Sequence, residues 1–353
     1  MSCISENQAQ RVIGGVFALH EAQPTDPSTG KRPFLEPNVM FLANARGAFC
    51  YLGRTLRPRR VWLPSYLCSS IAEGFQAAGS EIAVYPLGEN LRCESDAWVQ
   101  QVESGDFVLR VHYFGFANAD PLYYEAVKRG ACLVDDAAQA LLSQGIGTDA
   151  DFVVYSPRKF VGVPDGGCLV SRSLLPEPSK QFATAPEAWW NESLSAVTLR
   201  RDFDRGGRDR DWFAKFQSAE SQAPALPYAM SDLSKRLLTG GIDFDAISAR
   251  RRSNYQLLLE FLGDVALFPE LPEGVVPLGF PVHVRKRDVI RKKLFEHGIY
   301  PPVHWPLQSF VPPTFESSHR LAARIMTLPC DQRYSAYDMK RMVTVLQRFM
   351  TCY

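Results

Sequence analysis

The stretch Cys132 to Val170, CLVDDAAQALLSQGIGTDADFVVYSPRKFVGVPDGGCLV, indicates how this chain folds. Two short, unbroken apolar runs, Ala131 to Val134 and Phe152 to Tyr155, are typical of strands that are buried on both faces of a parallel sheet. The first run ends in two aspartates and the second in a serine, and a lysine follows in the next loop. Because the carboxyl ends of parallel strands meet at one edge of a sheet, these side chains are expected to share one crevice.

A carboxylate after one strand and a lysine after the next suit pyridoxal phosphate as a cofactor. Lys159 is the residue type that condenses with the cofactor's aldehyde, and Asp136 is the type that keeps its pyridine nitrogen protonated. Taken singly, an aspartate pair is better explained as a helix N-cap, and a lysine as a solvated charge. The order of these residues along the chain, with the matches described next, favours the cofactor site.

The motif resembles that of the DegT/StrS family of fold type I aminotransferases, which aminate keto sugars on nucleotide carriers. That family has an acidic pair, an Ala-Ala-Gln or Ala-Ala-His step, a serine, the lysine and a Gly-Gly step. In this sequence the places are taken, in order, by Asp136, Gln139, Ser156, Lys159, Gly166 and Gly167. The resemblance covers residues 38 to 172 well and 228 to 353 loosely. It implies an α/β fold with a mostly parallel central sheet flanked by helices and a smaller α+β C-terminal domain.

The resemblance also implies a role for each residue around the cofactor ring. Lys159 would hold the cofactor as a Schiff base and act as the catalytic base, and Asp136 would pair with the ring nitrogen. Gln139 would hydrogen-bond the ring hydroxyl. Adjacent residues of a strand point to opposite faces, so Asp136 rather than Asp135 is expected to face the ring, and replacing Asp135 is expected to have little effect. Tyr66, just after Pro64, is the candidate for the aromatic residue that stacks on the ring, with a core tyrosine as the alternative.

A second group of residues is implied to hold the cofactor's phosphate. Ala45, Arg46 and Gly47 stand where the family has a Ser-Gly-Thr-Ala-Ala cradle, at a helix start whose amides and dipole favour an anion. An ordinary helix led by Asn44 is the alternative. Ser156 would add its hydroxyl, as in the family.

Two departures from the family pattern bear on the phosphate. Only two residues separate Ser156 from Lys159, fewer than the family commonly has, and Arg158 between them is expected to supply a phosphate or carboxylate contact. The family's Asn-x-Arg-Met-Ser step, whose asparagine reaches the partner subunit's phosphate, is reduced here to its Met-Ser end. We therefore expect a homodimer with a weaker contact across the interface, and Tyr228 is the candidate substitute.

The chain length of 353 residues suits a large cofactor-binding domain, residues 1–244, and a small C-terminal domain, residues 245–353. Residues 1 to 35 are rich in turn formers and are expected to form an arm across the surface. The mixed charge run LRRDFDRGGRDRDWF, residues 199–213, is interpreted as a solvated segment without chemistry. His112 is interpreted as a core histidine.

Composition excludes several classes of protein. A formal net charge of +1 gives no field that would favour nucleic acid or a membrane surface. The eight cysteines are scattered without a C-x-x-C pair or a close Cys/His spacing, which indicates reduced thiols in a cytoplasmic protein and no metal site. No run of about eighteen apolar residues is present, so no membrane span is expected.

The sequence thus predicts a pyridoxal phosphate-dependent aminotransferase that moves an amino group from an amino acid to a keto sugar on a nucleotide, in polysaccharide biosynthesis. The resemblance implies glutamate as the donor. A pyridoxal phosphate enzyme of another reaction type, such as a sugar dehydratase or a non-sugar aminotransferase, is one alternative, although dehydratases usually lack the lysine. A non-catalytic sensor that binds the cofactor is another.

Overall fold

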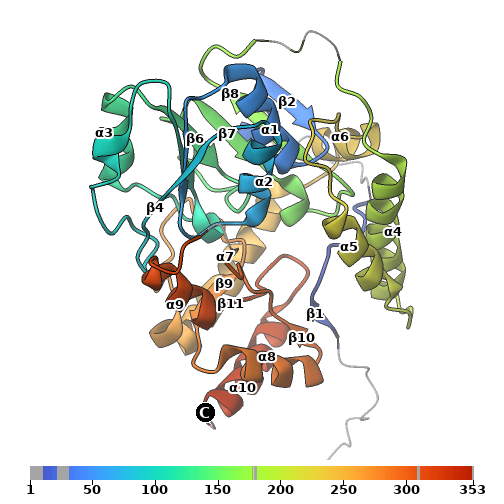
Figure 1. The fold of residues 1–353 in the computed structure, drawn as a ribbon. Helices are drawn as coiled ribbons and strands as arrows, with labels where there is room; N and C mark the ends of the chain where they lie inside the picture. Colours follow the sequence, from blue (N-terminus) through green and yellow to red (C-terminus); the bar gives the residue numbers. More distant parts are fainter. Residues whose placement is uncertain (1–10, 22–31, 177, 179–180, 308–310, 352–353) are drawn as a thin grey trace, which may run out of the picture.

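The computed structural model describes residues 11–21, 32–176, 178, 181–307 and 311–351. A central sheet with its helices forms one part, and helices with two short sheets lie beside it (Figure 1). Cys3, Cys352 and most of the expected N-terminal arm lie outside the described residues.

The central sheet has seven strands among the described residues, in the order β2-β8-β7-β6-β5-β3-β4. In chain order they are β2 Val39–Leu42, β3 Val61–Pro64, β4 Ile82–Tyr85, β5 Phe107–Val111, β6 Cys132–Asp136, β7 Phe152–Tyr155 and β8 Gly167–Ser171. Strands β4, β3, β5, β6 and β7 pair in parallel with one another. Strand β8 pairs antiparallel with both of its neighbours, β7 and the edge strand β2. The expected mostly parallel α/β sheet is confirmed.

The two strands that carry the motif are fully inside the sheet. Every residue of β7 is buried, and so are the last four residues of β6, as expected for apolar runs that are covered on both faces. In the parallel register Asp136 pairs with Val154, two residues before Ser156. The ends of β6 and β7 therefore adjoin at one edge of the sheet.

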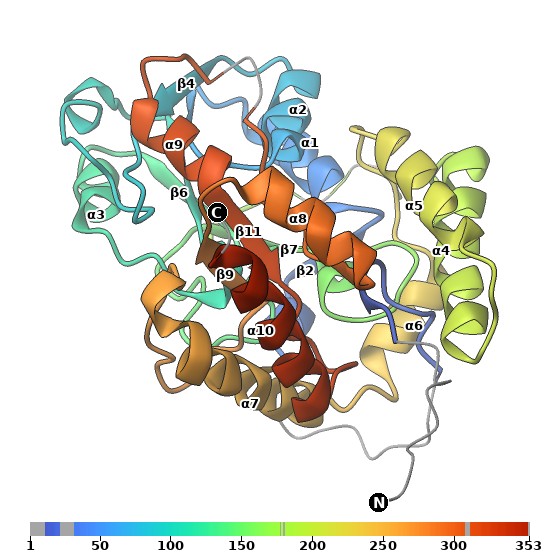
Figure 2. The same cartoon turned by 90° about the horizontal axis from the view of Figure 1, so that it is seen from below.

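Helices follow the strands and cover the sheet. They are α1 Ala45–Leu56, α2 Ser69–Ala77, α3 Pro121–Lys128, α4 Glu187–Asp204, α5 Asp211–Ser221, α6 Asp232–Thr239, α7 Phe244–Leu262, α8 Arg287–Glu296, α9 Glu316–Arg324 and α10 Ala336–Met350. Helix α1 is N-capped by Asn44, whose side chain accepts a hydrogen bond from the Gly47 amide. Helices α4 and α5 pack together as a hairpin beside the sheet (Figures 1 and 2).

The C-terminal part contains two small sheets. Strands β9 Phe280–His283 and β11 Ile325–Leu328 pair antiparallel, while β1 Ile13–Gly14 pairs in parallel with β10 Ile299–Tyr300. Helix α7 begins at Phe244, next to the boundary expected from the sequence. The division into residues 1–244 and 245–353 stays a prediction.

The expectation of an N-terminal arm on the surface is wrong for Ile13 and Gly14, and residues 16–20 are only partly exposed. Ile13 and Gly14 are buried in the β1–β10 pair, and further along His20 N donates to Gly162 O at 2.7 Å. Leu19 N likewise donates to the carbonyl of Val197 on α4. Burying the apolar residues of this short segment between other elements lowers the free energy of the folded chain. The turn formers nearby in the sequence gave no sign of this packing.

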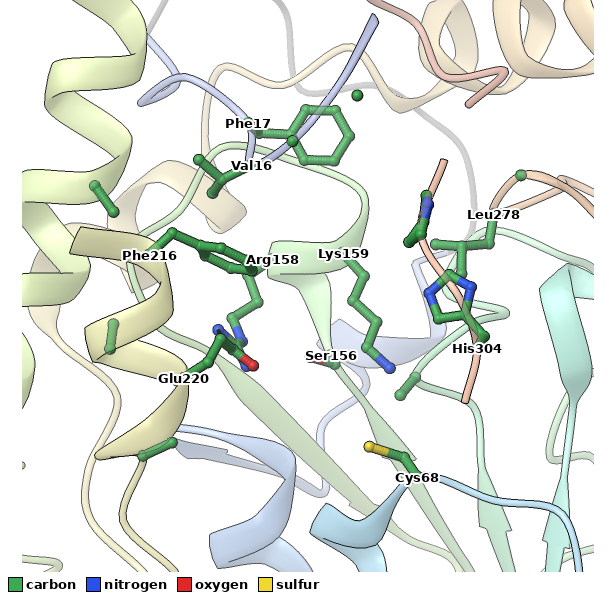
Figure 3. Close-up of a pocket in the computed structure, with 18 of the residues that line it drawn as sticks. Val16, Phe17, Cys68, Ser156, Arg158, Lys159, Phe216, Glu220, Leu278 and His304 are labelled. Atoms are coloured by element: carbon green, nitrogen blue, oxygen red, sulfur yellow. Dashed lines mark hydrogen bonds and ion pairs between the residues drawn. The ribbon is translucent and has the colours of Figure 1, made fainter. Parts of the chain in front are cut away.

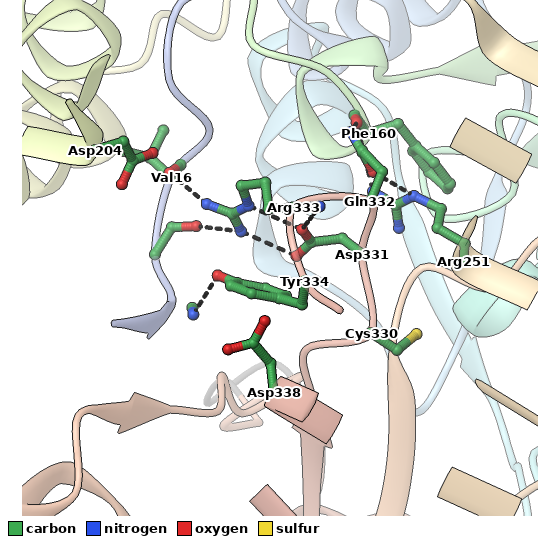
Figure 4. Close-up of polar contacts among 12 residues, drawn as sticks. Val16, Phe160, Asp204, Arg251, Cys330, Asp331, Gln332, Arg333, Tyr334 and Asp338 are labelled. Carbon is green, nitrogen blue, oxygen red and sulfur yellow. Dashed lines mark hydrogen bonds and ion pairs between the residues drawn. The ribbon is translucent and has the colours of Figure 1, made fainter. Parts of the chain in front are cut away.

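An arginine from the C-terminal part holds this segment in place (Figure 4). Arg333 donates to the carbonyls of Val16 and Gly15 at 2.9 and 3.1 Å, and its guanidinium lies 4.2 Å from the centre of the Phe17 ring. Asp331 accepts two hydrogen bonds from the same guanidinium, at 2.8 and 2.9 Å. One side chain thus satisfies two carbonyl groups of a segment that makes few backbone hydrogen bonds of its own.

The described cysteines form no disulfide, as the sequence indicated. Within the described ranges, no helix has the length and apolar character needed to cross a membrane.

The close approach of residues 13–20 to the lysine loop can be tested at Gly162. A Cβ atom at this position would lie 1.6 Å from Ala18 O, so Gly162→Ala must displace the segment. We expect the free energy of unfolding to fall by about 2 to 3 kcal/mol, as for other overpacked sites, when measured by urea denaturation. Gly263→Ala is the control, because a Cβ atom there meets nothing within 4 Å. Equal stability of the two variants would show that the segment does not lie against Gly162.

Candidate active site

A cavity of about 840 Å³ opens at the carboxyl ends of β6 and β7. Asp136 and Ser156 line it from the ends of these strands, and Lys159 lines it from the loop that follows (Figure 3). The crevice predicted from the strand order is therefore present, and it gathers these three residues.

Lys159 reaches the cavity from a single turn of 3-10 helix, Pro157–Lys159, whose last amide donates to Ser156 O at 3.1 Å. Its amine extends toward His304 in Figure 3. Within the described part of the chain, the amine has no hydrogen bond and no ion pair. His304 is neutral at ordinary pH, because burial and, second, the charge of Lys159 lower its pKa to about 3. A lysine amine beside a neutral imidazole is open to reaction with a ligand.

Asp136 is buried and has one hydrogen bond, which its Oδ1 accepts from the Ala138 amide at 2.9 Å. Burial raises the pKa of this carboxyl, and the nearby Lys159 amine offsets the rise only in part. A buried carboxylate without a cation in contact is costly, and such groups often mark a site that a cationic or proton-bearing ligand completes.

Asp135 faces the other side of the sheet and is fully paired. Its two oxygens accept hydrogen bonds from Arg110 at 2.8 and 2.9 Å, and Nε2 of His112 lies 2.8 Å from Oδ2. Burial by itself would raise the pKa of Asp135, but these two neighbours outweigh it and the pKa is lowered. The alternation of a strand thus separates the two adjacent aspartates, as expected, and His112 belongs to the core side.

The N-terminus of α1 forms one end of the cavity, with Asn44, Ala45 and Arg46 on the wall. The amides of Ala45 and Arg46 are the first of the helix, where the helix itself offers no acceptor. Gly167 lets β8 pass directly behind this turn, since a Cβ atom there would lie 2.4 Å from the Asn44 carbonyl carbon. The start of α1 lies at the cavity and carries the Asn44 cap that was the alternative, while its role as an anion cradle stays a prediction.

Comparison with known proteins adds solved structures of the same fold. No protein-family model and no curated protein matches this sequence. The chain is similar to the aminotransferase TlmJ from Streptoalloteichus hindustanus (TM-score 0.64, 19% identity, 92% of each chain covered). It is also similar to a DegT DnrJ EryC1 StrS aminotransferase from Brucella abortus (0.60, 16%, 88% of this chain and 86% of that chain) and to DesI, solved with its TDP-sugar product (0.62, 19%, 89% and 80%).

The chain has the fold of these aminotransferases. The fold that the sequence resemblance implied, fold type I, is thereby confirmed over most of the chain.

In this fold, two predicted phosphate contacts are already engaged within the chain. The amide of Gly47 donates to Oδ1 of Asn44 at 2.8 Å. The guanidinium of Arg46 donates to Ala223 O and to Ser70 Oγ and lies 3.0 Å from Glu73, so this side chain ties α1 to α2 and to the segment after α5. Among the groups of Ala45, Arg46 and Gly47 that could donate to a phosphate, only the backbone amides of Ala45 and Arg46 have no partner from these contacts.

Gln139 is buried in the turn after β6. Its Oε1 accepts a hydrogen bond from the Phe114 amide at 2.8 Å, while its Nε2 is buried without a partner among the described residues. It does not form part of the cavity wall as the structure stands. The role predicted for Gln139 at the ring hydroxyl stays a prediction, which the unpaired donor supports.

Tyr66 is not on the cavity wall. Its hydroxyl donates to His304 O, and its ring packs against Tyr113 and Trp305 with centroids 6.0 and 5.7 Å away. Cys68, two residues further on, lines the cavity instead. This position fits the alternative of a core tyrosine and gives no support to ring stacking by Tyr66, because Pro64 ends the strand and the chain turns the tyrosine inward before α2.

Two segments that were assigned no chemistry line the cavity. Val16 and Phe17 come from the N-terminal segment, and Phe216 and Glu220 come from α5, where Glu220 lies 2.5 Å from the Arg158 guanidinium (Figure 3). The interpretation of residues 199–213 as solvated is wrong in part, because Arg200 is buried. The apolar residues Trp212, Phe216 and Ala219 recur at helical spacing, and this was the signal that could have revealed a packed helix.

The charge state of Asp136 leads to a prediction for the protein without cofactor. Burial raises its pKa in the folded chain above the unfolded value, so the folded state holds an extra proton, and the free energy of unfolding falls as the pH rises from about 4 through the raised pKa. Asp136→Asn avoids this loss and is expected to stabilise the protein at about pH 7 by roughly 1 to 3 kcal/mol. Urea denaturation measures this difference in the free energy of unfolding, which should become smaller at about pH 4. A variant less stable than wild type at neutral pH would contradict the unpaired state of Asp136.

The neighbouring substitution is expected to act in the opposite direction. Asp135→Asn removes the carboxylate that pairs with the buried Arg110, so the free energy of unfolding should fall by about 3 to 5 kcal/mol. The mild effect expected from the sequence concerns the transamination rate and stays a prediction, separate from this loss of stability. The same urea series measures both variants, and a mild loss for Asp135→Asn would mean that Asp149, the second partner of Arg110, suffices.

Proposed function

We propose that this protein is a pyridoxal phosphate-dependent aminotransferase. The observation that carries the proposal is that the Lys159 amine and the Asp136 carboxylate enter one cavity from adjacent strand ends, and that neither forms an ion pair within the described residues. A structural aspartate as buried as Asp136 would be expected to have a cation as its partner in the chain.

The residues present fit this cofactor. Asp136 is a buried carboxylate that lacks a cation, and a protonated pyridine nitrogen would supply one. Gln139 has a buried amide donor that lacks an acceptor, and a ring hydroxyl oxygen would supply one. The start of α1 and the hydroxyl of Ser156 offer donors to a phosphate. Asp136 and the start of α1 face the cavity, so a ring nitrogen and a phosphate of one molecule would suit both.

Pyridoxal phosphate, when bound, supplies an aldehyde that links to an amine and a ring that accepts electrons from a carbanion. Asp136 holds the proton of the ring nitrogen, where charge assistance is worth most because the site is buried. Lys159 anchors the cofactor and then, as a free amine, moves a proton at the reacting carbon. The neutral His304 beside it adds no competing charge.

For the substrates, we propose an amino acid, glutamate, as donor and a keto sugar on a nucleotide as acceptor. The support is the sequence resemblance and the fold of DesI, which was solved with a TDP-sugar product. A cavity of about 840 Å³ leaves room for a substrate beside the cofactor. The same resemblance leads us to propose a homodimer, and the scattered cysteines lead us to propose a cytoplasmic protein.

The attachment residue can be identified chemically. Reduction of the pyridoxal phosphate-loaded protein with borohydride, followed by peptide mapping, should place the pyridoxyl group on Lys159, because this amine alone follows the serine at the end of β7. Lys159→Arg keeps the charge and should remain unlabelled. A label on another lysine in the wild-type protein would disprove the assignment.

Turnover separates an enzyme from a sensor. Adding glutamate to the loaded protein should convert the absorbance of the aldehyde form to that of the amine form, and Asp136→Asn should slow this conversion by about a hundredfold or more, since it removes the charge that assists the ring. Tight binding with no spectral change for any amino acid would favour the sensor.

A further inference from the structure

The arginine side chains at the phosphate end of the cavity are already paired with carboxylates of the same chain. Arg158 Nη1 lies 2.5 Å from Glu220 Oε1, and Arg46 Nε lies 3.0 Å from Glu73 Oε2. Each pair sums to no net charge. A phosphate that enters this end with close to two negative charges therefore finds helix amides and a serine hydroxyl, but no arginine that is free of a carboxylate.

The two pairs differ in how readily a ligand can reach them. The guanidinium of Arg46 is also fixed by Ala223 O and Ser70 Oγ. Arg158 has only Glu220 as a hydrogen-bond partner among the described residues, and its Nε is buried without an acceptor. Both Arg158 and Glu220 line the cavity, and their side chains are 24% and 42% exposed. A pair of this kind contributes little stability and is open to exchange.

We propose that Glu220 competes with the cofactor's phosphate group for Arg158, so that phosphate binding releases the carboxylate from the guanidinium. This inference rests on the proposed function, because it takes the phosphate to bind beside Ser156 and the start of α1. Arginine binds phosphate through two parallel hydrogen bonds, and a phosphate offers more charge and more acceptor oxygens than one carboxylate.

The position of α5 makes a rotation of the Glu220 side chain sufficient for the exchange. The backbone around this residue is held by Trp189 Nε1, which donates to Ala219 O at 3.0 Å, and by Asn44 Nδ2, which donates to Pro224 O at 3.0 Å. The carboxylate therefore stays on the cavity wall at a fixed place in the chain. Its negative charge lowers the affinity for phosphate even after Arg158 has changed partner, since like charges a few ångströms apart repel in a partly buried site.

Replacing Glu220 with glutamine, which removes the charge and keeps the shape of the side chain, tests the proposed competition. Dissociation constants of pyridoxal phosphate and of pyridoxal, which lacks the phosphate, are measured on the cofactor-free protein by absorbance titration. Glu220→Gln is expected to tighten pyridoxal phosphate about tenfold and to leave pyridoxal unchanged. Inorganic phosphate, measured as a competitor of pyridoxal phosphate, should also bind more tightly to the variant.

Three further variants test whether the effect depends on the Arg158 pair. Glu192→Gln removes the partner of Lys215, 2.8 Å away, in a pair that joins α4 to α5 outside the cavity wall, and it should change none of the three constants. In the Arg158→Gln background, Glu220→Gln should have a smaller effect than in the wild-type protein, because the competition needs the guanidinium and only the direct repulsion remains. Arg158→Gln alone should weaken pyridoxal phosphate and not pyridoxal.

A change of affinity in the opposite direction overturns the inference. If Glu220→Gln weakens pyridoxal phosphate as Arg158→Gln does, the carboxylate orients the arginine rather than competing for it. An equal shift for pyridoxal and pyridoxal phosphate would also refute it, since the phosphate would then play no part. A wild-type protein that binds neither compound would instead refute the proposed function. Inorganic phosphate would then be titrated directly by calorimetry, where tighter binding by Glu220→Gln would still support the competition and unchanged binding would refute it.

Discussion

The parallel pairing of β6 with β7 is the constraint on which the site depends. The register that sets Asp136 beside Val154 brings the ends of both strands to one edge, so a carboxylate and a lysine loop from separate parts of the sequence face each other. Parallel strands are covered by other elements on both faces, and the apolar residues of β6 and β7 are suited to this burial. A slip of one residue would exchange Asp136 for Asp135 in the cavity and bury the wrong charge.

The two aspartates show how the chain distributes the cost of buried charge. Asp135 is compensated within the chain by Arg110, and the bidentate contact lowers its pKa. Asp136 is left without a cation, and burial raises its pKa. The pairing of Asp135 stabilises the fold. The unpaired Asp136 lowers the stability of the chain, and a ligand that supplies a positive charge can offset this loss.

The cavity is closed by segments that are distant in sequence from the motif. The N-terminal residues 13–20 pass beside the lysine loop and are held by Arg333, while α5 contributes Phe216 and Glu220 to the cavity wall. Asn44 and Arg46 bond to carbonyls just after α5, so the start of the phosphate cradle and the position of Glu220 belong to one connected set of contacts. The walls that define a substrate's space are therefore set by long-range packing.

The sequence by itself determined the sheet, its strand ends and the pair Lys159 and Asp136, because hydrophobic periodicity and strand alternation act over a few neighbouring residues. It also placed the start of α1 at the site through a local cap and a glycine. Only the tertiary structure decided that Tyr66 turns into the core, that residues 13–20 pack beside the lysine loop and that Glu220 faces Arg158. These outcomes depend on contacts between residues tens to hundreds of positions apart, and no local pattern records which partner a side chain meets when the chain has folded.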